Sequence, residues 1–279
     1  MNLEGLQTVS TRSLTVPANI AAGIRLAAHA ITWNIPRGGD FEPWLDAVKE
    51  TGYAGVAIFG MQLEDFIDRP ETLRHILQVR GLELAAVTCF VNDSDQWINR
   101  VLHFMAEMGV RHLACTDFDS TLTIARAVEI LNGWAKVGDD LGVNVYYHNH
   151  TGGVGETLTQ VEELFNALDP AHRHEMLDVG HATKDFAELP PEERAADFLS
   201  RHWDRIEFME LKDWNEATDL NTPLGEGYAD FERIISLIAG GGYEGWIVVE
   251  QNGNMGPSRG RGPKECAQIS RQFLRGYGL

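Results

Sequence analysis

The sequence contains few cysteines and no long hydrophobic run. Its three cysteines, Cys89, Cys115 and Cys266, lie far apart and form no CxxC or similar spacing. That distribution argues against a disulfide framework and against a cysteine-based zinc cluster. No run of about 18 apolar residues is present, and the first residues lack the charged and apolar segments of a signal peptide. We therefore expect a cytoplasmic protein that does not cross a membrane.

Basic residues are also scarce. The 279 residues include 23 Lys and Arg against 41 Asp and Glu, which gives a formal net charge of −18. Nucleic acids and anionic membranes carry charge of the same sign and would be repelled. The expected ligand is therefore a cation or a neutral polar molecule, and neither nucleic acid nor membrane is an expected partner.

Several catalytic motifs are missing, and so is any linker. The segment 37–40 is a poor match to the glycine-rich turn that binds dinucleotides after a first strand. The glycines of residues 151–155 are not followed by the Lys-Ser/Thr pair of a P-loop, and no Gly-x-Ser-x-Gly elbow of a hydrolase occurs. No Pro/Ser-rich break divides the chain, so we expect one domain.

Short apolar runs alternate along the chain with segments of helical periodicity. The expected strands are residues 26–34, 55–59, 82–90, 112–116, 143–147, 175–178, 205–211 and 245–252. The expected helices are residues 41–51, 71–79, 97–108, 121–140, 159–168, 191–201, 230–239 and 262–276. A capping box at Thr159–Glu162 is expected to begin the fifth of these helices.

Eight such units within one domain length predict a single-domain (β/α)8 TIM barrel over residues 26–279. An open, doubly wound sheet is the alternative, but it predicts the glycine-rich turn that is missing here. Residues 1–25 have little pattern and are expected to form an N-terminal arm that lies on the domain or reaches a neighbouring subunit. A homo-oligomer is therefore a further prediction.

Four of the expected strands run directly into carboxylates or histidines. These residues are His148 and His150, Asp178, Glu210 and Glu250. The carboxyl ends of parallel strands meet at one mouth of a barrel, where several carboxylates would repel one another unless a cation lay between them. The pattern therefore predicts a divalent metal site that includes Asp178, Glu210 and Glu250.

Each of these residues also has a simpler interpretation. Asp178 could cap a helix, and Glu210 could pair with Lys212, which could instead orient a substrate hydroxyl or donate a proton. His148 and His150 would face the same side of an extended segment, although a single histidine is more often structural. Glu156 either folds back over the metal or begins the next helix.

Aromatic and amide side chains complete the expected site. Trp33, Asn34 and Trp214 are expected to form the wall of a pocket, because aromatic planes pack well against the C–H faces of a polyol ring. Core packing is the simpler interpretation of Trp246, which precedes the carboxyl end of its strand.

A set of motifs spread over the chain from residue 26 onward resembles a known family. The motifs are Ile-Thr-Trp-Asn at 31–34, Gly-Tyr-Ala-Gly-Val at 52–56, Tyr-His-Asn-His at 147–150, Leu-Asp-Val-Gly-His at 177–181, Leu-Lys-Asp at 211–213, and Gly-Tyr-Glu-Gly-Trp at 242–246 leading to Glu-Gln at 250–251. Together they resemble the xylose isomerase-like TIM barrel superfamily of sugar isomerases and epimerases, with the inosose dehydratase branch nearest.

The resemblance implies a divalent metal held by strand-end carboxylates and a histidine, acting on keto sugars or related polyols. By position, Asp178 and Glu250 match metal ligands, and His181 matches a residue near the substrate. Glu210 stands where relatives usually have histidine, which favours manganese or magnesium over zinc. His148 stands where many have glutamate, which leaves Glu156 as a substitute ligand. The usual acidic residue of the second strand is also missing from residues 57–59.

The resulting hypothesis is a metal-dependent lyase that removes water from a cyclic keto polyol such as 2-keto-myo-inositol. Mn²⁺ is the expected metal, with Mg²⁺ or Co²⁺ as alternatives. Glu156 or Glu250 would take the proton next to the ketone, and His148, His181 or Lys212 would protonate the leaving hydroxide.

Other functions remain open at this point. An epimerase, an isomerase or an enzyme that cleaves 3-keto glycosides would use the same site. A sugar-binding or partner-subunit barrel without catalysis is an alternative of another class. Nucleases that share the barrel are disfavoured by the charge of −18.

Overall fold

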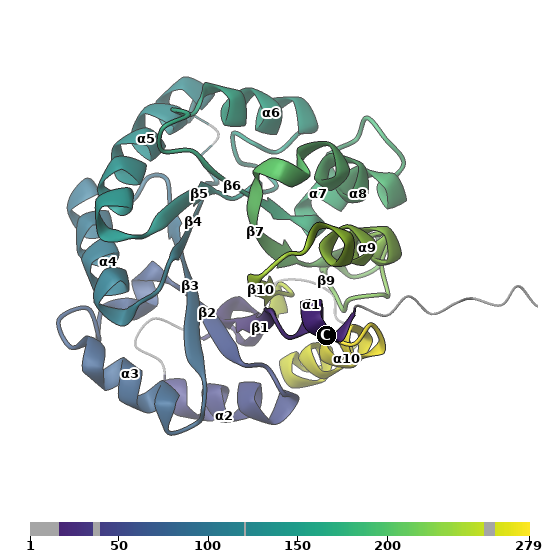
Figure 1. Cartoon of the computed structure of the whole chain (residues 1–279), viewed down its shortest axis with the longest axis horizontal. Helices are drawn as coiled ribbons and strands as arrows, with labels where there is room; N and C mark the ends of the chain where they lie inside the picture. The colour runs from purple at the N-terminus through teal and green to yellow at the C-terminus, as the bar shows by residue number, and fades with distance from the viewer. Residues whose placement is uncertain (1–16, 36–39, 120, 254–259) are drawn as a thin grey trace, which may run out of the picture.

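The computed structural model describes residues 17–35, 40–119, 121–253 and 260–279. Eight parallel strands close into a barrel in the order β1-β10-β7-β6-β5-β4-β3-β2, with helices around its outside (Figure 1). The barrel strands are β1 Ile24–His29, β2 Gly55–Phe59, β3 Glu83–Phe90, β4 His112–Thr116, β5 Asn144–Tyr147, β6 His174–Asp178, β7 Ile206–Leu211 and β10 Gly245–Val249. The predicted single-domain (β/α)8 barrel is confirmed.

The outer layer consists of α-helices, with a few short 3-10 turns between elements. The α-helices are α1 Ala18–Ala21, α2 Phe41–Thr51, α3 Pro70–Gln78, α4 Asp95–Met108, α5 Ile124–Leu141, α6 Leu158–Ala167, α7 Val179–Asp185, α8 Pro191–His202, α9 Phe231–Gly241 and α10 Pro263–Gly276. The 3-10 helices are η1 Ala30–Trp33, η2 Gly60–Leu63 and η3 Trp203–Arg205. In the part of the chain that is described, no helix combines the length and apolar character needed to cross a bilayer.

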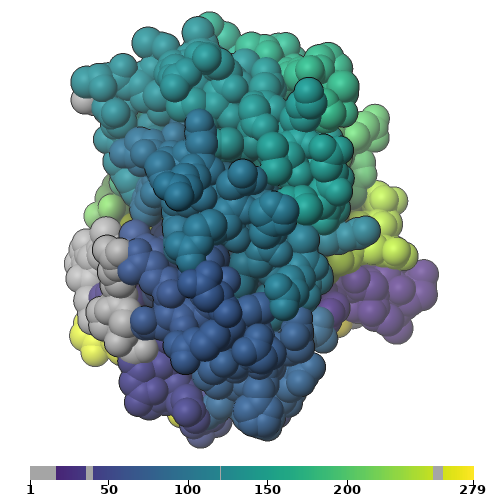
Figure 2. Space-filling model, turned by 90° about the vertical axis from the view of Figure 1, so that its left-hand side faces the viewer, coloured from purple at the N-terminus to yellow at the C-terminus, as the bar shows by residue number. Residues whose placement is uncertain are grey.

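Local sequence signals explain why the helices begin and end where they do. Asp40 caps the first turn of α2 through its side chain, and Gly52 ends the helix with φ 86°, a left-handed conformation that glycine adopts without a Cβ clash. The 3.6-residue period places Trp44, Leu45 and Val48 on the buried face. Figure 2 looks onto the side of the barrel that α3, α4 and α5 cover.

The interior of the barrel is filled unevenly. Small side chains come from β1 to β4, and large ones come from the strands opposite. The buried interior cluster consists of Ala27, Ala57, Ala85, Ala86, Ala114, Tyr146, Met176, Phe208 and Val248. These buried side chains fill the interior of the barrel, which is therefore a packed core rather than a pore.

The first strand is shorter than predicted. It ends at His29, whose ring accepts a hydrogen bond from the Ile31 N–H and so caps η1. Trp33 is therefore the last residue of a 3-10 helix rather than part of a strand, and Asn34 follows that helix with φ 50°. At the other end β1 begins at Ile24, inside the predicted 1–25 arm. Residues 1–16 of that arm lie outside the described residues.

Two further predictions are corrected around the barrel mouth. The capping box lies at Thr157 and Gln160 instead of Thr159–Glu162, because the Thr157 hydroxyl and the Gln160 amide each bond the other's backbone N–H. The long loop expected after β7 contains a hairpin of β8 Asp213–Asn215 with β9 Asp219–Thr222, and the segment after β6, which lies outside the expected elements, contains α7.

Candidate active site and metal centre

A group of ionisable side chains lies at the carboxyl ends of neighbouring barrel strands. His148 after β5, Asp178 ending β6 and Glu210 in β7 each offer a ligand atom, and these atoms lie within 4.8 Å of one another. All three side chains are buried. Glu250, the residue after β10, is hydrogen-bonded to Glu210 and completes a cluster with three carboxylates.

Asp178 is held in place from several directions. Its Oδ1 accepts the His181 N–H at 2.8 Å and so caps α7, while Oδ2 lies 3.1 Å from His148 Nε2. The Asn149 side chain bonds both backbone groups of Asp178, accepting from its N–H at 2.8 Å and donating to its carbonyl at 3.0 Å. Asp178 therefore fulfils both sequence interpretations, because it caps a helix and joins the carboxylate group.

Lys212 supplies the positive charge beside these carboxylates. Its Nζ donates to Glu250 Oε1 and lies 3.4 Å from His181 Nε2. The side chain is 1% exposed. A Cβ at Gly180 would lie 2.6 Å from the Lys212 Cβ and Cγ, so the start of α7 can pack on the lysine stem only with glycine there.

The ionisable groups of the cluster have pKa values that are shifted in different directions. Burial, together with the charges of Glu250 and Asp178, raises the pKa of Glu210 well above its usual value. Burial also acts on Glu250, but Lys212 and His29 outweigh it and hold the pKa of Glu250 below its usual range. Burial would lower the pKa of Lys212, yet Glu250 and Asp178 raise it. These shifts favour the protonated form of Glu210 and the charged forms of Glu250 and Lys212.

Two polar atoms in this cluster are buried and have no hydrogen-bond partner within the described residues. They are Nδ1 of His148 and Oε1 of Glu210. Leaving such atoms unpaired costs about 1 to 3 kcal/mol each, and burying several carboxylates together adds to that cost. An imidazole with carboxylate oxygens is a common donor set for divalent cations, so these residues fit a divalent metal.

A cavity of about 400 Å³ opens above the cluster, and His148 and Glu250 form part of its lining. Phenylalanines dominate one wall. The rings of Phe59 and Phe90 stack with centres 6.0 Å apart, Phe90 lies 5.6 Å from Phe118, and Phe118 meets His150 edge-on at 4.4 Å. The cavity therefore combines a charged floor with an aromatic wall.

The structure brings together some of the predicted substrate-binding residues and separates others. Asn34 and His150 line the cavity. Trp33 packs against Trp44, with ring centres 6.3 Å apart, and Trp214 donates to Asp219 at 2.9 Å. Neither tryptophan is among the residues that line this cavity. The phenylalanine wall takes the place that the sequence assigned to Trp33 and Trp214.

Glu156 lies outside the ligand group. It is half-buried, and its negative charge contributes to raising the pKa of Asp185. The fifth-strand position in the cluster belongs to His148. Of the two residues that the sequence left open there, the geometry favours the histidine.

Comparison with known proteins agrees with this architecture. Residues 45–277 match the model of the family described as xylose isomerase-like TIM barrel. The chain belongs to the xylose isomerase-like TIM barrel family. Inosose dehydratase of Salmonella typhimurium is 30% identical over 83% of this chain and 90% of its own length. Inosose dehydratase of Geobacillus kaustophilus is 26% identical over 81% of this chain and 86% of its own length.

Two solved structures have the same fold. The IOLI protein with a binding zinc atom superposes with a TM-score of 0.70 at 15% identity, covering 91% of this chain and 98% of its own. D-psicose 3-epimerase with D-tagatose from Clostridium cellulolyticum H10 gives 0.72 at 16% identity, covering 91% and 98%. The family match and the sequence relatives indicate that this chain is an enzyme of the lyase or isomerase type.

Several site residues escaped the sequence analysis. His29 Nδ1 lies 3.2 Å from Glu250 Oε2, and its Nε2 lies 3.1 Å from Thr88 Oγ1. A histidine that ends an apolar strand was the available signal, but extending that strand to Asn34 concealed it. Asn149 lies between two histidines, and the sequence gives no separate signal for it. Phe59 and Phe90 looked like ordinary strand residues.

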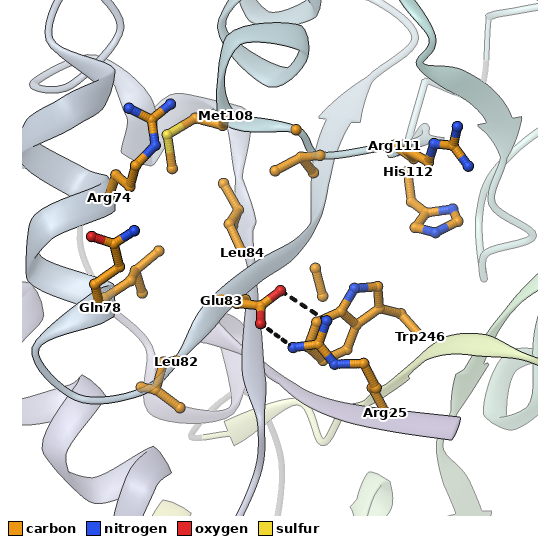
Figure 3. A pocket seen from close by; sticks show the side chains of 14 residues that line it. Arg25, Arg74, Gln78, Leu82, Glu83, Leu84, Met108, Arg111, His112 and Trp246 are labelled. Carbon is orange, nitrogen blue, oxygen red and sulfur yellow. Dashed lines mark hydrogen bonds and ion pairs between the residues drawn. The ribbon is translucent and has the colours of Figure 1, made fainter. Parts of the chain in front are cut away.

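A second cavity, of about 360 Å³, lies at the opposite opening of the barrel, where the strands begin (Figure 3). Arg25 pairs with Glu83 there, and its guanidinium lies 3.9 Å above the ring of Trp246. Trp246 therefore covers the amino-terminal opening of the barrel and is not part of the candidate metal site. Active sites of this barrel type occupy the carboxyl ends, which is where His148 Nδ1 and Glu210 Oε1 lie unpaired.

Proposed function

We propose that this chain is a divalent-metal-dependent lyase that removes water from a keto-inositol or a related cyclic keto polyol. The observation that carries the proposal is the buried cluster of His148, Asp178, Glu210 and Glu250 beneath the cavity. Two of its polar atoms lack a partner among the described residues. The inosose dehydratases among its relatives support the choice of substrate.

His148, Asp178 and Glu210 would hold the metal, with Glu250 as the fourth ligand. When bound, a divalent ion at this position acts as a Lewis acid that polarises the ketone of the substrate. The set contains an imidazole where the sequence hypothesis had Glu156. It is therefore less strongly biased toward manganese or magnesium than a set of four carboxylates would be. Manganese remains our first choice, with magnesium, cobalt and zinc as alternatives.

Glu250 and Lys212 would carry the protons of the elimination. Glu250 takes the proton from the carbon next to the ketone, and the electrons of that C–H bond form the new double bond. Lys212 gives a proton to the departing hydroxide, which leaves as water. Because the two side chains are hydrogen-bonded, the proton held by Glu250 can return to Lys212, and both groups regain their initial states.

The decisive experiment uses the whole enzyme, stripped of metal and reloaded separately with Mn²⁺, Mg²⁺, Co²⁺ or Zn²⁺. Water loss from 2-keto-myo-inositol is followed as the enone product appears, and the same reaction in D₂O reports exchange of the α-proton. We expect metal-dependent dehydration. Deuterium uptake without water loss would instead indicate an epimerase or isomerase, and no reaction with any of the four metals would exclude this substrate.

The phenylalanine wall favours one further candidate, cleavage of a 3-keto glycoside that carries a planar apolar group. Phe118 is 58% exposed at the cavity, which leaves its ring available to such a group. The chemistry would be the same α-proton removal, with the glycosidic oxygen leaving in place of hydroxide. Phe118→Ala should then raise KM for an aryl 3-keto glucoside and leave KM for the keto-inositol unchanged.

A further inference from the structure

The cavity at the amino-terminal opening of the barrel lies at the other end of the strands from the metal centre and has no part in the proposed function (Figure 3). Its wall comes from the starts of β1, β3, β4 and β10, from α3, and from the end of α4 with the loop that follows. Its volume of about 360 Å³ falls within the range of small-molecule sites, about 300 to 1,000 Å³. The cavity is therefore large enough for a small organic ligand.

The charge around this cavity has the opposite sign to the charge of the whole chain. Three arginines line it, Arg25, Arg74 and Arg111, against one carboxylate, Glu83. The chain as a whole has 41 Asp and Glu against 23 Lys and Arg. A cavity whose charged lining is mainly positive concentrates anions rather than cations.

The Glu83 carboxylate is already neutralised by Arg25. Nη1 of Arg25 donates to Glu83 Oε2 at 2.8 Å, and Nη2 pairs with the other carboxylate oxygen. Such a bidentate pair carries no net charge. The positive charge that remains in the lining therefore comes from Arg74 and Arg111.

Arg74 and Arg111 form no ion pair with a carboxylate in the described part of the chain. Nη2 of Arg74 donates to the Glu107 carbonyl at 2.8 Å, and this neutral acceptor leaves the charge uncompensated. Arg111 is exposed and precedes β4, across the cavity from Arg74 on α3 (Figure 3). A guanidinium presents parallel N–H groups that match two oxygens of a carboxylate or phosphate. Arg111 can therefore bind an anion without first losing an ion partner.

The rest of the lining is mostly apolar. His112 adds no charge near neutral pH, because burial and the nearby Arg111 lower its pKa to about 4. Its ring stacks on Phe208 with centres 4.4 Å apart. The apolar residues of the lining are Leu77, Leu82, Leu84, Ala85, Met108, Val110 and Trp246. A ligand that matches this lining has an anionic group and an apolar body.

We propose that this cavity binds a small organic anion, with Arg111 as the contact for a carboxylate or phosphate group and the apolar lining around the body of the ligand. Arg74 adds positive potential from α3. The site goes beyond the proposed function and does not depend on it, because the cavity shares no residue with the metal centre. A neutral molecule of the same shape leaves the guanidinium without an ion partner and binds less tightly.

NMR of the full-length protein with added Mg²⁺ tests the site without any measurement of activity. The indole ¹⁵N–¹H signal of Trp246, assigned with Trp246→Phe, reports on the cavity. The probes are benzoate and phenyl phosphate, with benzamide as the neutral match and inorganic phosphate as the anion without an apolar body. We expect both organic anions to shift the Trp246 signal, and the two comparison probes to bind at least about tenfold more weakly.

Two results of this titration would overturn the proposal. The first is that neither organic anion shifts the signal up to about 10 mM, a weak limit for ligands of this size. The second is equal affinity for benzoate and benzamide, because the cavity would then not select a negative charge.

Arg111→Gln tests the assigned contact. We expect the affinity for benzoate and phenyl phosphate to fall by about tenfold and the affinity for benzamide to stay unchanged. Arg100→Gln is the matched control, because Arg100 is a surface arginine that pairs with Asp68 at 2.8 Å and does not line the cavity. An equal loss in both variants would show a general effect of net charge and would overturn the role of Arg111.

The same titrations distinguish the two sources of the anionic group. Tighter binding of phenyl phosphate supports a phosphorylated ligand, and tighter binding of benzoate supports a carboxylic acid. None of these readouts uses turnover of a keto-inositol. The failure of the anion site and the failure of the proposed function are therefore seen in separate experiments.

Discussion

The ionisable groups at the two openings of the barrel differ in their partners, although Oε2 of buried Glu175 at the amino-terminal opening also lacks one among the described residues. At the amino-terminal opening, His174 lies between two carboxylates, with Nδ1 2.7 Å from Glu207 and Nε2 3.1 Å from Asp139. At the carboxyl-terminal opening, His148 Nδ1 and Glu210 Oε1 have no partner among the described residues. Paired groups stabilise the fold, whereas unpaired ones are retained at a cost that a ligand can offset.

The largest expected effect follows from removing one charge of the unpaired group. Asp178→Asn keeps the size of the side chain and its ability to cap α7, since asparagine is also a good cap. We expect kcat to fall on the order of 10³-fold or more and bound metal to be lost in elemental analysis. Glu207→Gln at the opposite opening is the control and should keep both. Full metal content in Asp178→Asn would contradict the assigned centre.

Lys212 tests the same opening without replacing a metal ligand. Lys212→Met keeps the length of the apolar stem against Gly180 but removes the proton donor. We expect kcat to fall by about 10² to 10⁴-fold, while elemental analysis still finds metal. Lys184→Met is a matched control, because Lys184 pairs with Asp219 at 2.9 Å rather than with the cluster. An unchanged kcat in Lys212→Met would rule out its role as the acid.

A substitution at the amino-terminal opening should lower the stability of the fold and leave the activity unchanged. Glu175 is 1% exposed, and Arg205 Nε donates to it at 2.9 Å. Arg205→Met leaves that carboxylate with a single arginine, Arg173, at 3.1 Å. We expect a loss of about 2 kcal/mol in unfolding free energy, measured by urea denaturation, because the pair is partly exposed. Activity per folded molecule should be unchanged, and a fall in kcat would break the distinction between the two openings.

The smallest expected effect is a dependence of stability on pH. Hydrogen bonds to Glu207 and Asp139 raise the pKa of His174, although burial opposes the rise. Protonated His174 therefore stabilises the fold fully below the unfolded pKa of about 6.5, and this contribution is lost as pH rises through the higher folded pKa. His174→Gln should flatten that part of the unfolding profile by less than about 1 kcal/mol. An identical profile in the variant would refute the assignment.

Much of the fold could be predicted because its signals are local. Gly52, Gly109, Gly142 and Gly242 end helices in left-handed conformations, and the apolar periods between them identify strands and helices. The predictions for α2, β2 and β4 match the structure residue for residue. Errors occur where side chains cap turns, as at His29 and Thr157, because such contacts compete with the period of the strand or helix.

The candidate site could be predicted in part for the same reason. Asp178, Glu210 and Glu250 stand out as carboxylates after apolar runs, and the parallel barrel brings strand ends together. The place of Glu156 could not be decided, because a glycine-rich segment separates it from β5 and its path depends on packing. The aromatic wall could not be foreseen either, since Phe59 and Phe90 are typical strand residues.

The sequence by itself therefore determined the barrel, its family and the carboxylates at its mouth, since these depend on local periods and strand ends. Only the tertiary structure decided that His148 rather than Glu156 joins those carboxylates, that Lys212 bonds Glu250, and that Arg25 pairs with Glu83 at the opposite opening. These are contacts between distant strands and loops, and their geometry depends on how the closed sheet orients each strand end.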